Sequence, residues 1–250
     1  MSPLTISLLI GGLLVAGATA GVALRRVLPD SHLDAHTKDV VRLGCGLIAT
    51  ISGLVLGLLI NSAKTTFETQ RDEVKQVTAN VILLDQALER FGPESRDARL
   101  HLRKIVPDIA NHIWRDANRR NNGVFYSVDG GERIFSEVRH LPAVNEDQHF
   151  YQALAVQALT AILQTRVLLF EQEQAPVPGI LLGILVFWLV VLFVSFSLFS
   201  PLSPIGRIAI VVFAVSSSAA LFLILEMYQP FSGLLQIDST PLRQALLPLG

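Results

Sequence analysis

Four long stretches of the chain contain only uncharged, mostly apolar residues. They are 4–24, 43–60, 180–199 and 208–225, with lengths of 21, 18, 20 and 18 residues. A helix rises about 1.5 Å per residue, so each stretch is long enough, or nearly so, to cross a hydrocarbon layer of about 30 Å. Lipid offers the backbone no hydrogen-bond partners, and a spanning segment must therefore be helical. The pattern predicts an all-α membrane protein with four transmembrane helices in two hairpins.

A polar region separates the two hairpins. Residues 61–179 contain 14 of the 20 Lys and Arg residues and 16 of the 21 Asp and Glu residues. We interpret its charged faces as solvated surface, and its near neutrality offers no basic run for nucleic acid. The expected domains are a first transmembrane hairpin at 1–62, a water-facing helical bundle at 63–178, a second transmembrane hairpin at 179–228 and a C-terminal tail at 229–250.

Helix-forming residues continue beyond the second apolar stretch without a stop signal. Apolar residues then recur at alternating spacings of three and four, the heptad pattern of a helix packed lengthwise against a partner. They are Phe67, Val74, Val77, Val81, Leu84 and Leu88, with Gln70 in the remaining place. Gly92 and Pro93 should end this helix, because glycine suits a C-cap and proline cannot continue the hydrogen-bond ladder.

The rest of the middle region is predicted from its helix formers and breakers. Helices are expected at 94–120, with a kink at Pro107, and at 147–174. Residues 121–147 show no clear period, and the run Asp129-Gly130-Gly131 is typical of a turn.

The first apolar stretch is interpreted as a membrane helix that is retained. Ala18-Thr19-Ala20 offers an A-x-A cleavage site, but Arg25 and Arg26 follow the run, and a signal peptide has the opposite charge order. Four crossings place both termini and the middle region on one side of the membrane. Five basic residues lie near the membrane on each side, so the positive-inside rule does not decide the orientation.

Small and polar residues follow one face of the second membrane helix. They recur at spacings of three and four, and they are Gly46, Thr50, Gly53, Gly57, Asn61 and Lys64. One interpretation is close helix packing, since Gly53-x-x-x-Gly57 is the usual contact pattern and Gly17-x-x-x-Gly21 repeats it in the first helix. The other is a pore face in a ring of subunits, with Asn61 and Lys64 at its mouth. Both require small side chains, and both stay open.

These small-residue faces and the heptad pattern need partners that a four-span monomer does not supply. A closed homo-oligomer is therefore expected.

Other candidate groups are few. Glu226 ends the fourth apolar stretch, where a carboxylate either marks the helix boundary or serves an ion pathway or a partner arginine. His32 and His36 have the i, i+4 spacing of a metal pair, but no third close ligand stands out beyond nearby carboxylates, so no metal site is expected. The single Cys45 excludes an intrachain disulfide. Without a phosphate-cradling glycine loop, G-x-S-x-G or H-E-x-x-H motif, neither an enzyme nor a cofactor is expected.

Several residue clusters resemble the bestrophin-like family of small bacterial membrane proteins. They are Lys38-Asp39-Val40-Val41, Gly46-Leu47-Ile48-Ala49-Thr50, Phe91-Gly92-Pro93-Glu94, Ile113-Trp114, Leu225-Glu226 and Pro230-Phe231-Ser232-Gly233. The resemblance covers nearly the whole chain. It implies a multi-pass protein of the bacterial inner membrane, in contact with the lipid bilayer, with its termini and middle domain in the cytoplasm.

A more distant resemblance is to the bestrophins themselves, pentameric ion channels whose second membrane helix lines the pore. In them a Pro-Phe-Gly segment follows the fourth helix, and Pro230, Phe231 and Gly233 are similar, with one residue inserted. An acidic run used as a calcium clasp comes next in bestrophins, whereas only Asp238 follows here. Residues 43–60 also lack the aromatic residues of the bestrophin pore neck. Neither calcium gating nor an aromatic neck is therefore expected.

The resemblance implies a homo-oligomeric ion channel, with a pentamer as the form known in bestrophins. The alternative is a non-conducting oligomeric scaffold or signalling module that binds a partner through its helical middle domain.

Overall fold

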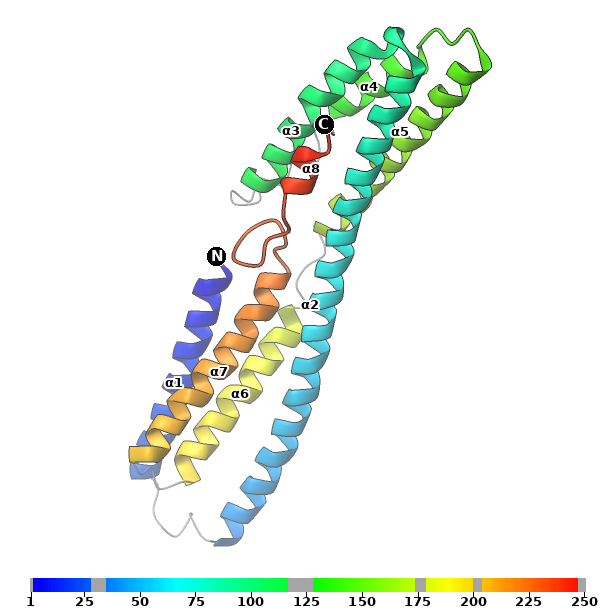
Figure 1. Cartoon of the computed structure of the whole chain (residues 1–250). Helices are drawn as coiled ribbons and strands as arrows, with labels where there is room; N and C mark the ends of the chain where they lie inside the picture. The colour runs from blue at the N-terminus through cyan, green and yellow to red at the C-terminus, as the bar shows by residue number, and fades with distance from the viewer. Residues whose placement is uncertain (1, 28–34, 117–127, 174–178, 200–203, 247–250) are drawn as a thin grey trace. The chain divides into compact units, whose positions relative to one another are not determined.

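The computed structural model describes residues 2–27, 35–116, 128–173, 179–199 and 204–246. Every regular element in these ranges is helical, as Figure 1 shows, which confirms the all-α class. The elements are α1 (Pro3–Val27), α2 (Ala35–Phe91), the 3₁₀ turn η2 (Pro93–Ser95), α3 (Arg96–Asp116), α4 (Val128–Arg139), α5 (Glu146–Glu173), α6 (Gly179–Phe199), α7 (Pro204–Met227) and α8 (Thr240–Gln244).

Within the described ranges, five helices are long and apolar enough to cross a membrane. Four of them, α1, α2, α6 and α7, contain the four apolar stretches of the sequence. The fifth is Glu146–Leu169 of α5, the least apolar of the set, which the sequence placed in the water-facing bundle. The number of four spanning helices therefore stays a prediction.

The chain forms two compact units, each built from segments far apart in the sequence. The first unit comprises Met1–Thr66 and Pro176–Tyr228, and the second comprises Phe67–Ala175 and Gln229–Gly250. Helix α2 contributes to both, because it runs without interruption through the boundary at residue 66. Its end at Phe91 confirms the predicted stop, and Gly92 there adopts a φ of 121°, a left-handed conformation that favours glycine.

In the first unit, α1 packs against α6 and α7. The two glycines of α1 allow this close approach: a Cβ atom at Gly17 would lie 3.3 Å from Val190 Cγ1, and one at Gly21 would lie 2.9 Å from Ser197 Cβ. At Gly21 the added atom would also collide with the carbonyl oxygen of Val194. The Gly17-x-x-x-Gly21 pattern is thus a packing contact inside the chain.

One face of α2 is buried along most of its length. In the first unit this face consists of Cys45, Ser52, Leu59 and Ala63, and in the second unit of Gln70, Val74, Val81, Leu84, Leu88 and Phe91. Leu59 and Ala63 join a core with residues of α1, α6 and α7, and Ser62 hydrogen-bonds the Tyr228 hydroxyl at 3.2 Å.

The predicted heptad seam is buried by other parts of the same chain. Val81, Leu84 and Leu88 share a core with residues of α3, α4, α5 and the C-terminal segment. The expectation that this seam needs a partner outside the chain is therefore wrong. The physical reason is that three further helices of the middle region lie against it, which a one-dimensional pattern cannot show.

Helix α4 corrects the prediction of an irregular segment at 121–147. The expected turn at Asp129-Gly130-Gly131 lies inside α4 instead. Ile134 and Val138, four residues apart on one face, are 3% and 0% exposed, and they pack in the core with residues of α3 and α5. This burial outweighs the cost of about 1 kcal/mol that each glycine imposes on a helix. Pro107 lies inside α3, which continues to Asp116.

Candidate functional site

The glycines in the small and polar stripe of α2 make no close contact with any other described part of the chain. Gly46, Gly53 and Gly57 are exposed, and a Cβ atom built on any of them meets no neighbouring atom within 4 Å. Thr50, Asn61 and Lys64 are also exposed, and the Thr50 hydroxyl donates to the Gly46 carbonyl at 2.9 Å. Packing against another described helix of the same chain therefore does not explain the glycines of this stripe.

Helix α2 presents three distinct faces in the first unit. At about 100° per residue, the stripe is centred about 130° from the buried face of Ser52, Leu59 and Ala63. A third face, about 75° from the stripe, is apolar yet exposed; its residues are Leu43, Leu47, Leu54 and Leu58, with exposed fractions of 76%, 64%, 71% and 59%. Bulky leucines suit lipid tails or a neighbouring subunit, whereas glycines and polar groups gain little from lipid.

Charged residues continue the stripe beyond Lys64. Glu68, Arg71 and Lys75 follow at spacings of four, three and four. Lys75 Nζ lies 2.9 Å from Asp72 Oδ1 and Arg71 Nε lies 3.6 Å from it, and the hydrogen bond from Lys75 is the main reason that the pKa of Asp72 lies below its usual value. The face of α2 that carries small side chains within the apolar stretch thus carries charged side chains beyond it.

Glu226 is buried, with 2% of its surface exposed, one residue before the end of α7. A carboxylate that only marks a membrane boundary would reach water, and this one does not. A buried carboxylate has to be paired or hydrogen-bonded to be tolerated. The burial of Glu226 is a feature that its position in the sequence did not reveal.

The segment after α7 forms a closed loop in the second unit. The amide of Ile237 donates to the carbonyl of Pro230 at 2.7 Å, and Gly233 adopts a φ of 90°. Phe231 meets the ring of Trp114 edge-on, with centroids 5.4 Å apart, and Trp114 Nε1 donates to the Ile237 carbonyl at 2.7 Å. Phe231 and the Ile237 carbonyl therefore anchor the C-terminal segment to α3, whereas Pro230 and Gly233 shape its turn.

Asp238 has a local role at the start of α8. Its Oδ1 accepts a hydrogen bond from the Thr240 hydroxyl at 2.6 Å and one from the Thr240 amide at 2.9 Å, and these bonds lower its pKa. In the part of the chain that the structure describes, no three His, Cys, Asp or Glu residues are grouped to hold a metal ion. His32 lies outside the described residues, whereas His36 is in the first turn of α2.

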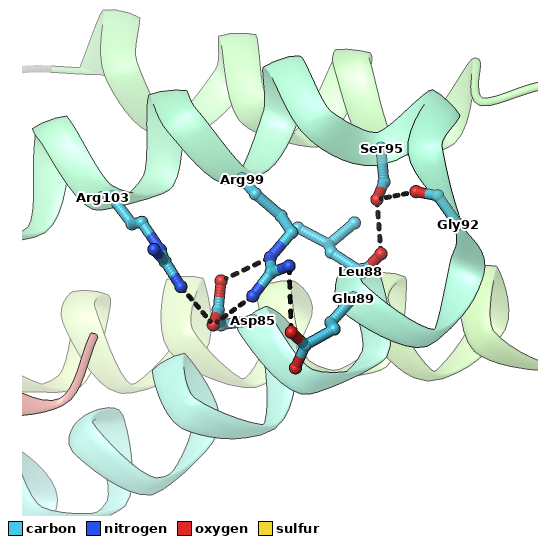
Figure 2. A network of polar contacts seen from close by, with 7 residues as sticks. All are labelled: Asp85, Leu88, Glu89, Gly92, Ser95, Arg99 and Arg103. Carbon is cyan, nitrogen blue, oxygen red and sulfur yellow. Dashed lines mark hydrogen bonds and ion pairs between the residues drawn. The ribbon is translucent and has the colours of Figure 1, made fainter. Parts of the chain in front are cut away.

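A network of ion pairs joins the end of α2 to α3 (Figure 2). From the sequence, these charged residues are expected only to form solvated surface. Asp85 receives two bonds from Arg99, Nε to Oδ1 at 2.9 Å and Nη2 to Oδ2 at 3.0 Å, and Arg103 Nη2 approaches Oδ2 at 3.4 Å. Burial alone would raise the pKa of Asp85, but the two guanidinium groups outweigh it and hold that pKa below its usual value.

Ser95 fixes the turn beside this network. It is fully buried, and its hydroxyl lies between the carbonyls of Leu88 and Gly92, the latter at 2.8 Å. Figure 2 shows the turn above the side chains of Asp85 and Glu89. A signal for the network was present in the sequence, because Arg96, Arg99 and Arg103 recur at helical spacing, but their acidic partners lie on another helix.

The structure thus places the predicted residues in three separate settings. The stripe of α2 stays together on one exposed face, and Glu226 is buried near the end of α7 in the same unit. Pro230, Phe231 and Gly233 belong to the second unit, where they close a turn.

Comparisons with known proteins relate the chain to one family. The family model for the bestrophin-like domain matches residues 12–242 of this chain. Crystal structures of two variants of a bacterial bestrophin homologue from Klebsiella pneumoniae superpose with TM-scores of 0.68 and 0.70, each at 14% identity and each covering 96% of this chain and 97% of that one. A crystal structure described only as a membrane protein gives a TM-score of 0.63 at 15% identity, over 94% of this chain and 97% of the other. Among curated proteins no sequence match is found.

Proposed function

This chain belongs to the bestrophin-like family, and on that premise we propose that it forms an ion channel in which the stripe of α2 lines the pore. Family membership identifies a channel-like membrane protein and favours transport over catalysis. The pore assignment rests on one observation, that Gly46, Gly53 and Gly57 of the stripe are exposed and meet no other described element of their own chain.

A homo-oligomeric ring gives this exposed stripe a reason to be small and polar. In such a ring α2 would turn Gly46, Gly53 and Gly57 to the axis, where small side chains leave room for ions and water. The adjacent apolar face, with Leu47 and Leu54, would then meet lipid or the next subunit. The heptad seam no longer argues for oligomerisation, because its residues are buried within the chain, so the proposal rests on the exposed faces alone.

Lys64 and Asn61 would ring the mouth of this pore. The charged residues that continue the stripe, Glu68, Arg71 and Lys75, would extend it toward the water-facing domain. Four spans, from α1, α2, α6 and α7, then place the termini and the middle domain on one side of the membrane.

We place that side in the cytoplasm, with the protein in the bacterial inner membrane. The motivation is the family resemblance, since the basic residues are evenly divided. A single cysteine at Val144, which is 86% exposed in the connection before α5, in a Cys45→Ala background should resist an impermeant thiol reagent in intact cells and react after lysis. Rapid labelling in intact cells would contradict this orientation.

The rival proposal is a non-conducting oligomeric scaffold that binds a partner through the second unit. It is favoured by apolar side chains left exposed there, since Phe150, Val167 and Leu168 on α5 are 62%, 59% and 49% exposed. On this view the glycine stripe of α2 would contact the same stripe or another face of a neighbouring copy.

Ion flux from reconstituted liposomes separates the two proposals. The wild type should conduct as an intact oligomer, and Gly53→Leu should reduce the flux while size-exclusion shows the same oligomer. Gly44→Leu is the matched control, because Gly44 lies on another face of α2 and also has open space around it. An intact wild-type oligomer without flux across a range of pH, calcium and voltage would favour the scaffold.

A further inference from the structure

The second unit carries an open hollow of about 480 Å³ beside the turn from α2 to α3. Most of the polar residues that line it are basic, and Figure 2 shows Arg99 and Arg103 among them. The residues that matter for its chemistry are Glu89, Pro93, Arg96, Arg99, Leu100 and Arg103. The volume falls in the range of small-molecule sites, about 300 to 1,000 Å³.

Two of the arginines are held in position by a partly buried carboxylate. Asp85 binds Arg99 through both of its oxygens, at 2.9 and 3.0 Å, and Arg103 through one, at 3.4 Å. Arg99 Nη1 also bonds Glu89 at 3.3 Å. A guanidinium group has five N–H donors, so Arg99 and Arg103 each retain donors for a further acceptor. Their positions are set before any ligand arrives, which lowers the entropic cost of binding.

The third arginine has no protein partner in the described part of the chain. Arg96 is the first residue of α3, is exposed, and its guanidinium makes no hydrogen bond or ion pair with the residues described. The residues that line the hollow include three arginines, Arg96, Arg99 and Arg103, but only one carboxylate, that of Glu89. The site therefore offers charge and donors to an anion.

We propose that this hollow binds a small organic phosphate monoester. Such a group carries close to two negative charges at neutral pH and three acceptor oxygens, and planar guanidinium forks match its geometry. Leu100, which is 59% exposed, and Pro93 form an apolar wall for the organic part of the ligand. This binding site lies in the second unit and does not depend on whether the chain conducts ions.

The test uses the purified full-length chain in a detergent without phosphate groups, with phenyl phosphate as the probe. Binding is followed by broadening of the ³¹P resonance and by the shift of the thermal midpoint. Arg96→Gln should weaken binding about tenfold, as expected for the loss of charge-assisted hydrogen bonds. Arg139→Gln, which removes the same charge from an exposed position on α4, should bind like the wild type.

A second pair of measurements tests the apolar wall. Phenyl phosphate should bind more tightly than inorganic phosphate, and Leu100→Ser should reduce the affinity for phenyl phosphate about fivefold while leaving inorganic phosphate unchanged. Arg96 and Leu100 are both exposed. Unchanged thermal midpoints of the two variants without ligand would show that the fold is intact. Absence of ³¹P broadening, equal loss in Arg96→Gln and Arg139→Gln, or equal affinity for the two probes would each overturn the proposal.

Discussion

Helices α1 and α2 carry the same G-x-x-x-G pattern in opposite environments. In α1, Gly17 and Gly21 lie against α6 so closely that no Cβ fits at Gly21 without displacing backbone. In α2, Gly53 and Gly57 have no described atom within 4 Å of where a Cβ would be. The same spacing therefore marks a packed face in one helix and an open face in the other.

The G-x-x-x-G motif specifies only that the side chains on one helix face are small. The surface that lies opposite decides whether this face packs against another helix or stays open. Opposite Gly21 is the carbonyl of Val194, a rigid group that cannot yield. Opposite Gly53 no described atom of the chain lies within 4 Å, so lipid, water or a neighbouring copy can occupy that side. Substitutions at the two faces can therefore measure which use each glycine has.

The largest effect is expected from Gly21→Leu. The side chain would have to displace the backbone of α6, so the first unit should lose about 3 kcal/mol or more of unfolding free energy, or fail to fold. Thermal unfolding in detergent, followed by circular dichroism, measures this loss. Gly12→Leu is the control on the same helix, since a Cβ there meets nothing within 4 Å; equal stability of the two variants would contradict the packing of α1.

The next effect is functional and concerns Gly57→Leu. The fold of the chain should be retained, whereas flux through reconstituted liposomes should fall by an order of magnitude or more, because added leucines narrow and dry a lumen. The measurement pairs flux with size-exclusion of the same sample. Loss of the oligomer, rather than of flux alone, would assign this face to packing between copies.

A smaller effect is expected from Lys64→Glu, which inverts a charge at the proposed pore mouth. The preference for anions over cations should fall severalfold with little change in stability, because the side chain is exposed. Reversal potentials in asymmetric salt measure the preference, and raised ionic strength should weaken the effect. An unchanged preference would place Lys64 away from the ion path.

The smallest effect is a difference in sign between two Gly→Ala variants. Gly53→Ala should stabilise α2 by about 0.5 to 1 kcal/mol, since alanine is the better helix former and the space is open. Gly21→Ala should destabilise, because its Cβ has no room. If Gly53→Ala instead weakens the oligomer, the open face of α2 contacts a neighbouring copy.

The sequence predicted those features that depend on the composition of single segments. Uninterrupted apolar length located α1, α2, α6 and α7, and the lack of a stop signal after Ile60 correctly carried α2 to Phe91. Helix α4 was missed because its two glycines are poor helix formers, and only the burial of Ile134 and Val138 by other helices compensates for them.

For the candidate site, the sequence could not show which part of the chain lies against each residue. The heptad residues could be recognised, but not that α3, α4 and α5 cover them. The arginines of α3 could be seen at helical spacing, but their partner Asp85 comes from α2. Likewise the burial of Glu226 depends on its neighbours in space, and the sequence offered only its place at the end of an apolar run.

The interleaving of the two units has a consequence for biosynthesis. The glycine face of α1 cannot be covered until Val194 and Ser197 of α6 have been made, and the core of the second unit awaits Leu242 and Leu246. Chain synthesis proceeds at about 5 to 20 residues per second, so α1 would wait on the order of ten seconds in the membrane with its packing surface uncovered. During synthesis this helix depends on lipid, or on the insertion machinery, to shield it.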